Sequence, residues 1–152
     1  MKQAMIATIA LFIGGSDCWG SDNNIMGNYN GVKGSYNDIW GSGNKVWGNG
    51  NGLEGNLNRV GGNWNVVKGH QNDVWGSFNG VGGNGNKVNG NVNGVIGDWN
   101  SVHGNYNGVV GNGNGVFGHA NGVFGNGNGI KGNANLVGGD RNRVYGSFNQ
   151  IW

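Results

Sequence analysis

Proline is absent from this chain, and cysteine occurs only once, at Cys18. A single cysteine excludes an internal disulfide, which small exported proteins often use for stability. Charged residues make up only 11% of the sequence, and no threonine follows Thr8. Because the formal net charge is +2 with Lys2 included, we expect no electrostatic capture of nucleic acid. No apolar run reaches the length that a membrane span needs, so none is expected.

The amino terminus has the pattern of a secretory signal. Lys2 supplies a positive charge, and residues 4–13 are largely apolar. Residues 14–16 are small, as is typical of the site where a signal peptide is cleaved. We therefore expect a signal and short leader over residues 1–19 and a secreted protein, extracellular or at a cell surface. Cys18 would then flank the cleaved segment or fall within it, with pairing between chains or lipid attachment as alternatives.

Glycine and asparagine follow a strict seven-residue repeat, Gly-x-x-Asn-x-Val-x, which runs from Gly20 to Trp152. All nineteen units open with Gly and carry Asn at position four, and position six is always aliphatic. A disordered glycine-rich tract has no physical reason to keep an aliphatic residue in phase, which disfavours disorder. Gly costs about 1 kcal/mol per helical position relative to Ala, and this excludes a coiled coil.

Each unit is typical of a short strand followed by a corner. Positions four and six are two residues apart and share one face of a strand, so positions three, five and seven point away. Gly at position one suits a corner with positive φ, and position two is always Asn, Ser, Asp or His, which are common beside turns. A strand of four or five residues is not stable alone. We therefore predict an all-β fold, a parallel β-solenoid over residues 20–152.

Stacking would place each Asn above another Asn at the strand spacing of about 4.7–4.8 Å, where side-chain amides can bond in a ladder. The aliphatic column beside it would form an apolar seam. The predicted polar ladder consists of Asn23, Asn30, Asn37, Asn44, Asn51, Asn58, Asn65, Asn72, Asn79, Asn86, Asn93, Asn100, Asn107, Asn114, Asn121, Asn128, Asn135, Asn142 and Asn149.

Aromatic residues gather at positions three and seven, which are predicted to face outward. Lateral packing between solenoids, contact with sugar rings and local stacking that stiffens the coil are three interpretations. We favour lateral packing together with local stacking. The predicted outward rows contain Tyr29, Tyr36, Trp40, Trp47, Trp64, Trp75, Phe78, Trp99, Tyr106, Phe117, Phe124, Tyr145 and Phe148.

The register Gly-x-x-Asn-x-Val-x-Gly resembles the Gly-x-x-Ser-x-Ala-x-Gly register in the head domains of trimeric autotransporter adhesins. This resemblance implies a left-handed parallel β-roll with two heptads per coil, and a triangular coil of three heptads is the alternative. With two per coil, nineteen units make nine and a half coils. The chain is also similar, more loosely, to curlin repeats, in which Gly-x-x-Asn-x-Ala recurs in a stacked, fibre-forming solenoid.

Capping segments are not evident beside the repeat, which Gly20 and Ile25 begin and Ile151 and Trp152 end. We therefore expect unpaired strand edges at both ends, where another copy can pair. The expected function is a secreted structural protein that assembles with itself, end to end, into an extracellular amyloid-like fibre. A surface adhesin that binds polysaccharide or a cell surface through its aromatic rows is the alternative. The lack of later threonine disfavours an ice-binding solenoid.

Catalytic and metal-binding patterns are not expected. His70, His103 and His119 do not share one repeat position, so they do not predict a metal site. No carboxylate pair or nucleophile stands in a distinctive setting, and we therefore expect neither an enzyme nor a cofactor.

Overall fold

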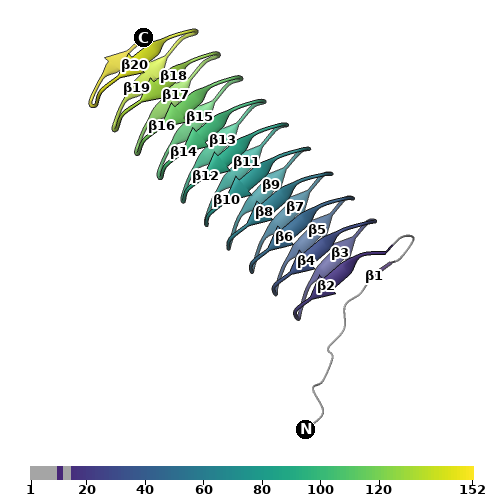
Figure 1. Ribbon diagram of the computed structural model, residues 1–152. Coiled ribbons are helices and arrows are strands. Elements are labelled where there is room, and N and C mark those ends of the chain that lie inside the picture. Colours follow the sequence, from purple (N-terminus) through teal and green to yellow (C-terminus); the bar gives the residue numbers. More distant parts are fainter. Residues whose placement is uncertain (1–9, 12–14) are drawn as a thin grey trace.

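The computed structural model describes residues 10–11 and 15–152, and these residues form 21 β-strands and no helix. Figure 1 shows them as a straight stack of flattened coils that rises regularly from the N-terminal to the C-terminal end. The strands are β1 (Ala10–Leu11), β2 (Asp17–Trp19), β3 (Asn24–Met26), β4 (Gly31–Lys33), β5 (Asp38–Trp40), β6 (Lys45–Trp47), β7 (Gly52–Glu54), β8 (Arg59–Gly61), β9 (Val66–Lys68), β10 (Asp73–Trp75), β11 (Gly80–Gly82), β12 (Lys87–Asn89), β13 (Gly94–Ile96), β14 (Ser101–His103), β15 (Gly108–Val110), β16 (Gly115–Phe117), β17 (Gly122–Phe124), β18 (Gly129–Lys131), β19 (Leu136–Gly138), β20 (Arg143–Tyr145) and β21 (Gln150–Ile151).

The coil contains two heptads. From β2 onward each strand pairs in parallel with the strand fourteen residues later, as where Val60 lies beside Val74 and Val74 beside Val88. Odd-numbered strands form one sheet of eleven strands, and even-numbered strands form a second sheet of ten. The predicted parallel β-solenoid with two heptads per coil is therefore confirmed, and the three-heptad coil is excluded.

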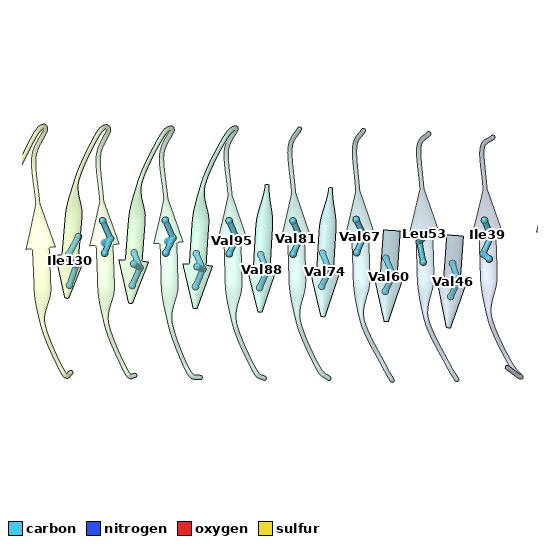
Figure 2. Close-up of a cluster of buried hydrophobic side chains, with 14 of the residues drawn as sticks. Ile39, Val46, Leu53, Val60, Val67, Val74, Val81, Val88, Val95 and Ile130 are labelled. Carbon is cyan, nitrogen blue, oxygen red and sulfur yellow. The ribbon is translucent and has the colours of Figure 1, made fainter. Parts of the chain in front are cut away.

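The core is the column of aliphatic side chains at position six. Figure 2 shows these side chains following one another along the axis, alternately from the two sheets. The side chains from Ile25 to Val144 are buried, and Ile151 of the last coil is partly buried against them. Val and Ile suit this place because β-branched side chains pack well on a pleated surface. Each buried Val contributes about 1.5–3 kcal/mol.

Most strands are three residues long, shorter than the predicted four or five. The reason lies at position three, where the backbone is left-handed: φ is 61° at Tyr36 and 59° at Trp64. A residue with this φ leaves the extended conformation, so the strand can begin only at position five. Position three therefore lies in the corner of the coil rather than on the outward face of a strand.

The stack includes residues that precede Gly20. β2 pairs with β4 so that Cys18 lies beside Val32, in the aliphatic column. Ser16 takes the place of the ladder asparagine, because its Oγ accepts a hydrogen bond of 3.1 Å from the Asn30 N–H. Burial, and secondarily the charge of Asp17, raises the pKa of the Cys18 thiol. The segment 15–19 thus forms a divergent unit, and β2 to β21 make ten strands in each sheet, or ten coils.

β1 departs from the repeat. It pairs with β3 at a separation of fifteen residues, with Ala10 beside Ile25, whereas all later pairs are separated by fourteen. The rest of the predicted signal, residues 1–9 and 12–14, lies outside the described residues.

Candidate functional site

The buried asparagines at position four form two hydrogen-bonded ladders, one along each sheet. Asn65 shows the arrangement: its backbone N–H and its Nδ2 each donate to Asn51 Oδ1 at 3.0 Å. Its Nδ2 also donates to the Gly76 carbonyl at 2.8 Å, and its Oδ1 accepts two bonds from Asn79. Seventeen of the nineteen asparagines are buried, and Asn142 and Asn149 in the last coil are half-buried.

This geometry explains why only Asn occurs at position four. The side chain must accept two hydrogen bonds from one neighbouring coil while it donates two others, and only a carboxamide offers both groups. Gln would place the amide one methylene too far from the backbone. Each ladder also has a direction, since the acceptor oxygens face the following coil and accept its backbone N–H groups.

The glycine at position one is required by the close approach of neighbouring coils. At Gly69, φ is 125°, and a Cβ would overlap the carbonyl oxygen of Gly83 in the next coil. The Gly69 carbonyl itself accepts a bond of 2.8 Å from Asn58 Nδ2. The corner glycine therefore belongs to the ladder as well as to the turn.

A second polar ladder lies in the corners, at position two, and the sequence did not reveal it. Here each side chain accepts a hydrogen bond from the backbone N–H of the residue fourteen positions earlier. The acceptor is Asn63 Oδ1 for Asn49, His70 Nδ1 for Asn56 and Asp98 Oδ1 for Asn84, at 2.9, 3.1 and 2.7 Å. The available signal was the restriction to Asn, Ser, Asp and His, which all carry an acceptor near the backbone.

The predicted aromatic residues are all exposed, and they divide among four surfaces. Because two heptads make a coil, alternate units contribute to opposite sides. One corner carries Tyr36, Trp64, Phe78, Tyr106 and Phe148, and the other Tyr29 and Trp99; the eleven-stranded sheet carries Trp40 and Phe124, and the ten-stranded sheet Trp47, Trp75, Phe117 and Tyr145. The ten-stranded sheet also carries Trp19, which precedes the regular repeat.

Several aromatic rings rest on a glycine of the preceding coil. The Trp75 ring occupies the space that a Cβ at Gly61 would need, and Trp152 covers Gly138 in the same way. In the corners Trp99 lies over Gly85. These three rings therefore contact the neighbouring coil, as the predicted local stacking requires.

The end coils have free edges in the described part of the chain. β20 pairs only with β18, and β21 only with β19. Ile151 continues the aliphatic column, while Trp152 is exposed. At the other end β2 is the first strand of its sheet, whereas β3 is paired with β1, so that Ala10 lies beside the buried Ile25. Gly20, between β2 and β3, has a φ of 135°.

The histidines are structural in their contacts. His70 and His119 belong to the corner ladder, and His103 stacks on Phe117 with ring centroids 4.8 Å apart. Within residues 10–11 and 15–152 no three side chains of His, Cys, Asp or Glu gather closely enough to hold a metal ion. The same residues contain no helix that is long and apolar enough to cross a membrane.

No protein-family model matches this chain, and no curated protein matches it.

Proposed function

We propose that this chain is a secreted structural protein whose copies stack end to end into an extracellular β-solenoid fibre. The supporting observation is that the two end coils are complementary. Asn149 donates its N–H to Asn135 Oδ1 at 3.0 Å, but its own Oδ1 accepts no bond from a described residue. Asn23 is the first asparagine of this ladder at the other end, on the strand edge with which β1 pairs. A second copy that places Asn23 on Asn149 would repeat the bond made inside the chain.

The whole number of coils supports the same arrangement. With the divergent unit of Ser16 and Cys18 included, β2 of one copy would stack on β20 of the previous copy, and β3 on β21. Residues 15–152 would then add ten coils without a half-turn, whereas nineteen units alone predict a half-coil remainder. This head-to-tail contact does not close on itself, so it generates a filament.

β1 has a role in this proposal because it pairs with the edge of β3 that the next copy would need. Removal of the predicted signal segment would expose that edge. Its fifteen-residue register interrupts the regular ladder, so β1 should compete poorly with an incoming coil. Assembly would therefore follow export.

The sequence resemblances belong to this proposal. The two-heptad coil agrees with the arrangement that the resemblance to adhesin heads implies, and self-assembly is the property that we take from curlin repeats. Surface adhesion through the exposed aromatic rings remains the alternative function.

Electron microscopy and fibre diffraction of the protein that begins at Ser16 test the proposal. We expect unbranched filaments with a strand reflection at about 4.7–4.8 Å and an axial repeat of about 48 Å, ten coils per subunit. Unassembled monomers at high protein concentration would contradict it.

A matched pair of variants examines the end coil. Ile151→Glu places a charge in the aliphatic column and should abolish filaments. Phe148→Glu adds the same charge in an exposed corner of the same unit, and its filaments should persist. Equal effects of the two variants would exclude β21 as the growing edge.

A further inference from the structure

The chain is nearly neutral as a whole, but the outer faces of its two sheets differ in net charge. We define the cationic face as positions five and seven of the ten-stranded sheet. It carries six cations, Lys33, Lys45, Arg59, Lys87, Lys131 and Arg143, and two carboxylates, Asp17 and Asp73, a net charge of +4. The same positions of the eleven-stranded sheet carry one cation, Lys68, and two carboxylates, Asp38 and Glu54, a net charge of −1.

The cations of this face have no ionic partner among the described residues. The one ion pair among the described residues joins Lys68 and Glu54 at 3.0 Å, and it lies on the opposite face. Asp73 accepts a hydrogen bond of 2.6 Å from Trp75 Nε1. Lys45 and Arg59 are register neighbours on β6 and β8, and like charges in this arrangement destabilise a sheet. Asp73 is the register neighbour of both Arg59 and Lys87, but it forms no ion pair with either. This one carboxylate therefore offsets only part of the repulsion among the cations of the face.

Two stacked tryptophans, which we call the aromatic platform, lie beside these cations. The rings of Trp47 and Trp75 are stacked with centroids 5.9 Å apart and planes inclined by 18°. Trp75 lies over Gly61, and each tryptophan keeps 41% of its surface exposed. Lys45 and Arg59 stand at position five of β6 and β8, next to this platform.

We propose that the cationic face binds an acidic polysaccharide. Sugar rings would lie on Trp47 and Trp75, and their carboxylate or sulfate groups would contact Lys45 and Arg59. This inference does not depend on fibre assembly, because one chain contains the complete platform.

Charge density favours a polysaccharide over nucleic acid. Ten strands spaced by about 4.8 Å span about 43 Å, so the face offers one net positive charge per about 11 Å. Duplex DNA carries one negative charge per about 1.7 Å, which this face would neutralise poorly. A polysaccharide with one acid group per disaccharide has a much lower charge density.

The ring orientation favours a polysaccharide over a membrane. Binding in a lipid interface requires apolar groups that enter the boundary between headgroups and acyl chains. The two rings instead stack on each other, and Trp75 covers Gly61 of the sheet, so they do not project toward an acyl layer. Their exposed surface can contact the apolar face of a sugar.

Binding of hyaluronan at low salt, measured by isothermal titration, tests the proposal. Lys45→Gln with Arg59→Gln should weaken binding at least about tenfold. The control variant, Lys68→Gln with Arg141→Gln, removes the same charge from the other face and a corner and should bind normally. The first variant removes the repulsion between Lys45 and Arg59 together with the attraction between Arg59 and Asp73, so its melting temperature should change little.

A second pair of variants tests the aromatic platform. Trp75→Ala should weaken binding about fivefold. Trp40→Ala is the matched control, because Trp40 Nε1 donates to Asp38 on the other face just as Trp75 donates to Asp73. Equal losses in both members of either pair would overturn the proposal. Tighter binding of duplex DNA or phosphatidylserine vesicles than of hyaluronan, or equal binding of neutral dextran, would overturn it too.

Discussion

The buried ladder at position four and the corner ladder at position two connect the same coils at the same fourteen-residue spacing. They differ in what each side chain must do. Asn65 accepts from Asn79 and donates to Asn51 and Gly76, whereas the Asn63 side chain serves mainly as an acceptor for the Asn49 N–H. A group that both donates and accepts restricts the position to one residue type.

A position that needs only an acceptor tolerates four residue types. Ser, Asn, Asp and His all occur at position two, and each presents an oxygen or nitrogen to the preceding coil. Exposure adds to this tolerance, because water can satisfy a corner N–H whose partner is lost. Position four is thus invariant because its side chain must both donate and accept hydrogen bonds, and position two varies because its side chain needs only to accept one.

Replacing a corner glycine should break both ladders at once and have the largest effect. In Gly69→Ala the new Cβ overlaps the Gly83 carbonyl, and the displaced Gly69 carbonyl loses its bond from Asn58. We expect a loss of more than about 4 kcal/mol in the free energy of unfolding, measured in urea. Gly94→Ala is the control, since a Cβ there meets no atom within 4 Å. Similar losses in both variants would show that glycine content alone matters.

An isosteric change should separate the two ladders. Asn65→Asp removes the buried donor and faces a carboxylate toward the Gly76 carbonyl, so we expect a loss of about 3–5 kcal/mol at neutral pH. Asn63→Asp, two residues away, keeps the corner acceptor and should change stability by less than about 0.5 kcal/mol. Urea unfolding of both variants is the measurement. If Asn63→Asp cost as much as Asn65→Asp, the proposed distinction between the ladders would be wrong.

Removing the corner acceptor should have a smaller effect. Asn63→Ala leaves the Asn49 N–H to bond with water, and we expect a loss of about 1 kcal/mol in the free energy of unfolding. Asn63→Ser restores an acceptor and should recover part of it. A loss in Asn63→Ala as large as that in Asn65→Asp would instead indicate that water does not reach the corner.

The regular positions of the repeat could be predicted from the sequence, because position four and position six repeat without exception. The divergent unit could not, since Ser16 and Cys18 replace Asn and Val and no Gly stands at position 13. The corner ladder was hidden because its acceptors are also common turn residues. The cationic face was hidden for a different reason. Lys45 and Arg59 are neighbours when two heptads make one coil but not when three do, so their shared face follows only from the choice between these two coils, which the structure makes.

The smallest effect is expected where the corner is strained. Val92 has a φ of 57°, which is costly for a β-branched residue, and Asn adopts this conformation more readily. Val92→Asn should therefore raise the free energy of unfolding by about 0.5–1 kcal/mol. Val110→Asn is the matched control, because Val110 lies on a strand and is 42% exposed against 43% for Val92. It should be neutral or destabilising, since Asn is disfavoured in strands. A gain in both variants would show that replacing an exposed valine with a polar residue is stabilising in itself, without relief of backbone strain. The hydrogen-bond acceptor at position two would then be the one feature that restricts the residue types of the corner.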